Sequence, residues 1–147
     1  MKLILSQILY LYFKGFAYTH KHNQRDIYVH SDWQDYNGRF KTPTALQYDG
    51  EYKNVLSWGY SALAERPSRR RKSSERKPVE LFKLHLLNLQ SKPPLPNGLD
   101  YKKAIADYLR EMGKVIKQTI NDNWRVDFDT QVLIILSVNK FNFLSLL

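Results

Sequence analysis

The most regular hydrophobic pattern in this chain is a helical repeat in its last third. From Tyr101 to Ile120, apolar side chains recur mostly at spacings of three and four residues, which places them on one face of a helix. Asp100 precedes this run, where its carboxylate can accept hydrogen bonds from N–H groups of the first turn. The pattern predicts an amphipathic helix of about five turns that packs on a sheet.

Before this helix, short runs of apolar and aromatic residues between polar turns are typical of β-strands. The expected strands are residues 15–22, 27–29, 39–48 and 54–58. Asp49-Gly50 predicts the turn between the last two. Pro43 places the third strand at a sheet edge or a bulge, because proline has no N–H to donate within a sheet. Residues 60–65 fit one or two helical turns.

Two further runs determine the expected architecture. Residues 79–86 alternate, and as a strand they would place Phe82, Leu84 and Leu86 on one apolar face and Lys83 on the opposite, less apolar face. Residues 90–98 are rich in proline and predict a connector without regular structure. Residues 132–138 are apolar on both faces, which predicts a buried central strand. Short strands, a long helix and a buried strand together indicate an α/β fold with a mixed sheet.

The two ends do not share the patterning of residues 15–138. Residues 1–14 are apolar without alternation, and residues 139–147 contain no cap or turn. We therefore expect both ends to be foreign to this middle segment and the chain to be a piece of a larger protein. Val138-Asn139 can be encoded by a splice-donor-like sequence, so we expect the transcript to continue differently after Val138. In such a piece, part of the 132–138 strand should be left open to solvent.

Composition narrows the class of protein. With 147 residues, of which 43% are hydrophobic, the chain can build one domain with a sizeable core. It has no cysteine, so disulfide bonds, thiolate metal sites and cysteine nucleophiles are excluded. The apolar N-terminus is too short to cross a membrane and no small-residue cleavage site follows it. A cytoplasmic location without a membrane partner is the simpler interpretation, and secretion is the alternative.

The net charge of +9 has a local origin. The window from Arg66 to Lys77 holds seven bases and one acid. Its basic residues are Arg66, Arg69, Arg70, Arg71, Lys72, Arg76 and Lys77. We interpret residues 66–78 as a solvated loop, since the run has no apolar face to bury. The alternative is a polyanion patch that binds RNA or an acidic partner, with bases stacking on nearby aromatic residues, namely Tyr48, Tyr52, Trp58 and Tyr60.

Five segments, taken in order, resemble the first lobe of the actin-like (ribonuclease H-like) ATPase domain of the 70-kDa heat-shock protein family, in a divergent branch. The segments are Gly15 to His20, Lys41 to Ala45, Val55 to Tyr60, Phe82 to Leu84, and the long helix with Val132 to Val138. The first three are similar to the strand after the first phosphate loop, a threonine-proline stretch and a strand–helix junction. The fourth falls where the family carries a lysine followed by apolar residues, and the fifth is similar to a helix and a strand that end in valine-proline-alanine. The resemblance covers residues 15–138, about a third of a complete ATPase domain.

The resemblance implies a role for Lys83. In the family, this lysine reaches the γ-phosphate of Mg-ATP and the attacking water, where a fixed cation stabilises the charge of the transferred phosphoryl group. The alternative is an ordinary strand lysine with its amine in solvent.

Departures from the family pattern predict that the activity is lost. The first phosphate loop, aspartate-x-glycine-threonine-threonine, should precede Gly15, but Ile8 to Tyr12 offers no carboxylate, glycine or small hydroxyl. The second phosphate loop, the second lobe and the peptide-binding domain are missing from this sequence. We therefore expect the chain as it stands to be no enzyme and to retain no Mg-ATP cofactor site, with Lys83 inactive.

Other chemistry has little support in the sequence. A metal set can be imagined from four residues, His20, His22, His30 and Asp32. Their spacing matches no helix face or known ligand pattern, so we interpret the histidines as exposed loop residues. We expect no metal site.

Overall fold

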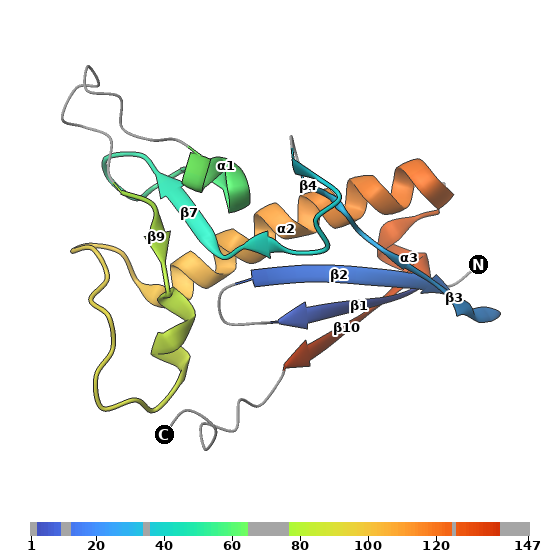
Figure 1. Ribbon diagram of the computed structural model, residues 1–147, viewed down its shortest axis with the longest axis horizontal. Helices are drawn as coiled ribbons and strands as arrows, with labels where there is room; N and C mark the ends of the chain where they lie inside the picture. The colour runs from blue at the N-terminus through green and yellow to red at the C-terminus, as the bar shows by residue number, and fades with distance from the viewer. Residues whose placement is uncertain (1–2, 10–12, 34–35, 65–76, 125, 139–147) are drawn as a thin grey trace.

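The computed structural model describes residues 3–9, 13–33, 36–64, 77–124 and 126–138 (Figure 1). Its elements in chain order are β1 (Leu3–Leu9), β2 (Phe13–His20), β3 (Asn23–Val29), β4 (Asp32–Trp33), β5 (Tyr36–Asn37), β6 (Thr42–Pro43), β7 (Ala45–Tyr48), β8 (Val55–Trp58), α1 (Gly59–Ala64), β9 (Val79–Glu80), the 3-10 helix η1 (Phe82–Leu86), α2 (Tyr101–Trp124), α3 (Phe128–Gln131) and β10 (Val132–Val138). The chain is mixed α/β with one long helix, as the sequence predicts.

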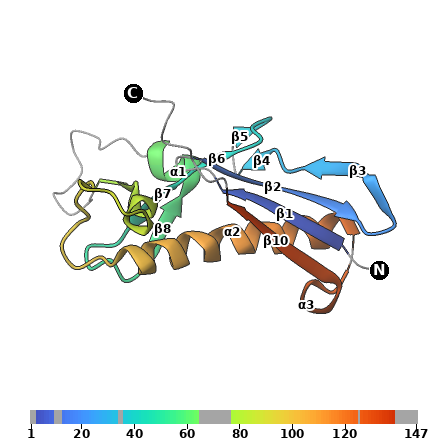
Figure 2. The ribbon, with the colours of Figure 1, turned by 90° about the horizontal axis from the view of Figure 1, so that it is seen from below.

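The main sheet is mixed and has the strand order β10-β1-β2-β3. β1 is antiparallel to β2 and parallel to β10, and β2 is antiparallel to β3. A parallel pair needs a long crossover connection, and here that connection contains α2. Figure 2 shows α2 running along one side of the sheet. The core therefore forms where the apolar face of this helix meets the sheet.

Leu3–Leu9 of the N-terminal apolar run belongs to this sheet as β1. Leu3 pairs with Val132 on one side and with His20 on the other. A continuous apolar run without alternation is typical of a strand inside a sheet, and that is the position of β1. Residues 139–147, the other end segment, lie outside the described residues.

β10 occupies the opposite role from the one expected. Residues 132–138 were predicted to form a central strand, but among the described strands β10 pairs only with β1 and ends the strand order. Leu133 is 58% exposed and Ile134 is 48% exposed, so the predicted burial is wrong for both. The expectation that part of this strand is left open is confirmed at the same two residues. The apolar composition of residues 132–138 favours burial, but it does not specify which strands pair with them.

The second sheet has the order β8-β7-β9. The predicted strand 39–48 is divided at Thr44: β6 pairs with β2 in the main sheet, and β7 pairs with β8 and β9. Proline at the end of β6 fits this division, because the chain leaves the ladder there. The predicted strands 15–22, 27–29 and 54–58 and the short helix 60–65 are confirmed as β2, β3, β8 and α1, with bounds that differ by a few residues.

α2 is the predicted amphipathic helix, although it ends at Trp124, one turn later than expected. The Asp100 carboxylate accepts a hydrogen bond from the backbone N–H of Lys102 at 3.2 Å, as a cap should. The buried face follows the helical repeat through Ala104, Asp107, Tyr108, Met112, Ile116 and Ile120. Tyr108 is fully buried, and its hydroxyl donates to the Pro43 carbonyl at 3.0 Å, which ties the helix to the point where the two sheets diverge.

Residues 79–86 do not form the predicted strand. Only Val79–Glu80 pair as β9; Leu81 then adopts a left-handed φ of 60°, and the chain continues as η1. In a 3-10 helix, residues three apart share a face, so the alternation of a strand no longer applies. Phe82 is fully buried whereas Leu86 is 64% exposed, so the predicted common face is wrong as well. Residues 90–98 contain no helix or strand, as expected for the proline-rich connector.

Candidate functional site

Lys83, the residue to which the resemblance gives a catalytic role, lies on η1 and not on a strand. It is half-buried. Burial and, as the smaller cause, the positive charge of Lys14 together lower the pKa of Lys83 to about 7. A lysine near this pKa is partly neutral at physiological pH, unlike the exposed strand lysine of the alternative interpretation.

Lys14 is a second buried amine within electrostatic range of Lys83. It is the second residue of β2, pairs with Thr42 of β6, and is only 2% exposed. Its Nζ lies 5.2 Å from the centre of the Tyr108 ring, a cation–π contact. Burial lowers the pKa of Lys14 to about 8. Sequence reasoning missed this residue because a single lysine in an apolar run carries no signal of burial.

The Tyr108 ring contacts Lys14 and also lies 6.1 Å from the ring of Phe82, the residue before Lys83. Burial disfavours the protonated form of each amine, and each charged amine disfavours the other. A bound anion would reverse both effects, so the pair is suited chemically to an anionic group. Of the segment 8–12, where the resemblance places the first phosphate loop, residues 10–12 lie outside the described residues and Ile8 and Leu9 end β1.

The four residues of the imagined metal set are not brought together. The His20 ring stacks on the Trp124 ring at 6.0 Å, and the His22 ring lies 5.4 Å from the His20 ring. His30 is 8% exposed and stacks on Phe16 at 4.5 Å, so its interpretation as an exposed loop residue is wrong. Within the part of the chain that the structure describes, no group of three or more histidine and carboxylate side chains is arranged to hold a metal ion.

The candidate polyanion patch falls almost entirely outside the described residues. Of its members, only Lys77 is described, and it is exposed. The aromatic residues considered for base stacking are otherwise engaged: Tyr48, Tyr52 and Trp58 are each less than 7% exposed and belong to the core. Tyr60 stacks on Tyr36 at 4.6 Å. These four rings therefore do not offer an open stacking surface.

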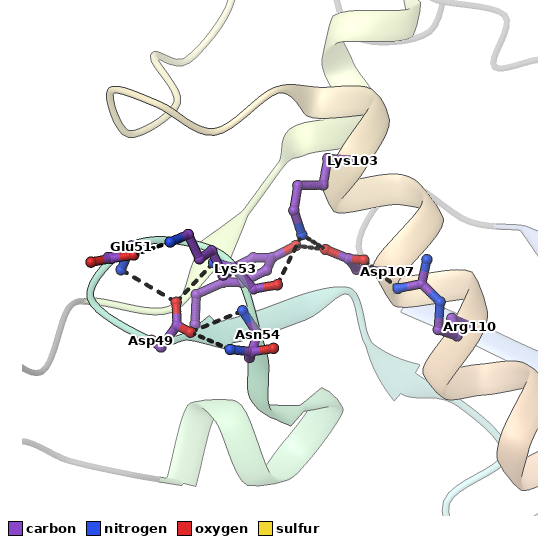
Figure 3. A network of polar contacts seen from close by, with 8 residues as sticks. Asp49, Glu51, Lys53, Asn54, Lys103, Asp107 and Arg110 are labelled. Carbon is purple, nitrogen blue, oxygen red and sulfur yellow. Dashed lines mark hydrogen bonds and ion pairs between the residues drawn. The ribbon is translucent and has the colours of Figure 1, made fainter.

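A buried carboxylate on α2 organises a polar network that sequence reasoning did not find (Figure 3). Asp107 accepts hydrogen bonds from the Tyr48 hydroxyl at 2.8 Å, from Lys103 at 2.5 Å and from Arg110. Burial by itself would raise the pKa of Asp107, but the hydrogen bonds from Lys103, Tyr48 and Arg110 outweigh it and hold the pKa below its ordinary value. The network joins α2 to β7, which is a structural role.

The same view shows Asp49 closing the turn between β7 and β8. Its carboxylate accepts from the backbone N–H groups of Lys53 and Asn54, at 2.8 and 3.0 Å. The predicted Asp49-Gly50 turn is therefore held by side-chain hydrogen bonds, an arrangement that aspartate favours.

No described helix is both long enough and apolar enough to cross a membrane. Comparison of the chain with protein-family models, with curated proteins and with solved structures finds no match. Its function is therefore inferred from its residues and their arrangement.

Proposed function

We propose that this chain is a partial first lobe of a heat-shock-type, actin-like ATPase domain, and that as it stands it neither binds nor hydrolyses Mg-ATP. One observation carries the first part. Lys83 comes within electrostatic range of Lys14, which follows the β1–β2 connection, although the two lysines are far apart in sequence. In the family, the corresponding lysine and the first phosphate loop act on the same phosphates, so their proximity supports the resemblance.

The main sheet supports the same proposal. The resemblance implies a mixed sheet in which the long helix leads to a final strand. Here α2 leads through α3 to β10, which lies parallel to β1. β1 also ends at Leu9, within the segment 8–12 where the resemblance places the first phosphate loop. In the parent protein the partner would be a second lobe, and the absence of cysteine favours a cytoplasmic location.

The loss of ATP binding follows from the groups that remain. Residues 8–12 supply no carboxylate for metal-bound water and no glycine for a phosphate loop. Lys14, which follows this segment, and Lys83, within electrostatic range of it, are cations that the described residues offer, and burial disfavours their charged forms. An ion pair of ordinary exposure contributes at most about 1 kcal/mol, whereas a dissociation constant of 1 μM requires about 8 kcal/mol. We therefore expect no saturable Mg-ATP binding below millimolar concentration and no hydrolysis above background.

Two measurements test the two parts separately. Calorimetric titration with Mg-ATP tests the inactivity, with Lys83→Ala as the matched variant. Micromolar binding that disappears in Lys83→Ala would show that the chain is a functional nucleotide-binding lobe. Backbone amide contacts between Leu3–Leu9 and Val132–Val138, measured by nuclear magnetic resonance, test the lobe architecture. A β10 that is antiparallel to β1, or not adjacent to it, would remove the support of the sheet.

A further inference from the structure

A small pocket lies where the β2–β3 hairpin meets the last residue of α2. It has a volume of about 240 Å³ and is lined by His20, Asn23, Asp26, Tyr28 and Trp124. Both views of the ribbon place this hairpin and the C-terminal end of α2 at the same end of the molecule (Figures 1 and 2). The pocket is smaller than the roughly 300–1,000 Å³ of sites for drug-sized ligands, so it suits a small group.

Two aromatic rings form a corner in this pocket. The rings of Tyr28 and Trp124 lie 5.5 Å apart with an interplanar angle of 78°. Each ring is supported by a second one: Tyr18 stacks on Tyr28 at 5.7 Å, and His20 stacks on Trp124 at 6.0 Å. Tyr18 is 7% exposed and belongs to the core, whereas Tyr28 is 46% exposed. The corner is therefore held by the core while its rings stay accessible.

A carboxylate, that of Asp26, lines the same pocket as the two rings. Asp26 Oδ2 accepts a hydrogen bond from Asn23 Nδ2 at 2.5 Å, which fixes the side chain within the hairpin. The Thr19 hydroxyl lies within hydrogen-bonding distance of the carbonyls of Asp26 and Asn23, at 2.9 and 3.0 Å, which holds the backbone of the same turn. Neither lysine nor arginine lines the pocket, so its charged lining group is an acid.

We propose that this corner binds a methylated ammonium group, the cation shared by choline and trimethyllysine. The faces of perpendicular aromatic rings carry partial negative charge and attract such a cation, which is too weakly hydrated and too bulky to form an ordinary ion pair. Asp26 adds a carboxylate to the lining of the same pocket. A divalent metal is a poorer fit, because the described residues contain no group of three ligating side chains here. A nucleotide is also a poorer fit, because no cation lines the pocket for its phosphates.

The binding can be followed on one indole group. The chain has three tryptophans, and Trp33 and Trp58 are 2% and 6% exposed in the core, so their indole N–H signals are internal references for Trp124. Choline and Nε-trimethyllysine are titrated separately at pH 8, where histidine is ordinarily neutral. We expect the Trp124 signal alone to shift, with a dissociation constant on the order of 1 mM. Tighter binding of one compound identifies the source of the group.

Two control ligands separate the cation from other attractions. 3,3-Dimethylbutanol has the shape of choline without its charge, and unmethylated lysine has the charge without the methyl groups. We expect at least tenfold weaker binding of both. Equal binding of the neutral analogue would reduce the site to an apolar pocket, and equal binding of lysine would reduce it to a charge attraction; either result overturns the proposal.

Matched variants locate the site. Tyr28→Ala should weaken choline binding at least tenfold, and Asp26→Asn about threefold, as for an exposed ion pair. Ile27→Ala is the control, because Ile27 is the neighbouring residue on β3, is 63% exposed and does not line the pocket. Loss of binding in Ile27→Ala, or full binding in Tyr28→Ala, would place the ligand elsewhere. These outcomes are independent of the ATPase proposal, because neither Lys14 nor Lys83 lines the pocket.

Discussion

Replacing Lys14 by methionine should stabilise this protein at neutral pH. Lys14 is 2% exposed, and burial lowers its pKa from 10.5 to about 8. That difference corresponds to roughly 3 kcal/mol by which the fold disfavours the charged amine. Methionine has a similar length and no charge, but it gives up the cation–π contact with Tyr108, which contributes about 0.5–2 kcal/mol. We expect Lys14→Met to raise the free energy of unfolding by about 1–2 kcal/mol at pH 7.

The pH dependence of this effect provides a sharper test. The pKa of Lys14 is lower in the folded state, so the unfolded chain binds more protons between about pH 8 and 10.5, and the stability of the native protein rises with pH across that interval. Lys83 adds to the same rise from about pH 7. Lys14→Met removes the part due to Lys14. The advantage of the variant should therefore be largest below pH 8 and shrink towards pH 10.5.

Urea unfolding at pH 7 and pH 10, followed by tryptophan fluorescence, measures both quantities. Lys21→Met, which changes an exposed lysine of the β2–β3 hairpin, is the control and should change stability by less than about 0.5 kcal/mol at either pH. In Lys14→Met the pKa of Lys83 should also rise, because a neighbouring positive charge is gone. A variant less stable than the native protein at pH 7, or a difference that does not change with pH, would refute the reasoning.

Two other predictions concern the helix and the open strand. Asp107→Asn should lower the free energy of unfolding, measured by urea unfolding, by about 1–2 kcal/mol, because a buried carboxylate with three donors is lost. The difference between the variant and the native protein should fall as the pH is lowered through the depressed pKa of Asp107. An unchanged urea midpoint would contradict the role of the network. The native chain should bind a hydrophobic dye at β10, and Leu133→Lys should reduce that binding. Leu63→Lys, at an exposed leucine of α1, is the control. Equal dye fluorescence with the native chain and with Leu133→Lys would show that the open strand is not the binding surface.

Local patterns in the sequence were sufficient for the elements whose formation depends on neighbouring residues. The repeat from Tyr101 onwards and the cap at Asp100 predicted α2 because both are properties of a single helix. The Asp49-Gly50 turn and the strand after it were predicted for the same reason, since aspartate closes its own turn through its side chain. The proline-rich connector 90–98 was evident from composition, because proline excludes both helix and strand interior.

The features that carry chemistry depend on contacts between distant segments, and only the tertiary structure decided them. Residues 3–9 and residues 132–138 are both apolar enough for a central position in the main sheet. The pairing of β1 with both β2 and β10 places residues 3–9 there and leaves residues 132–138 at the edge of the described sheet. The burial of Lys14 against Tyr108 and its electrostatic effect on Lys83 depend on residues that are far apart in the sequence. The aromatic corner joins residue 28 to residue 124. Hydrophobic periodicity specifies which face of a segment is buried, but the partner that buries it is chosen by the whole chain.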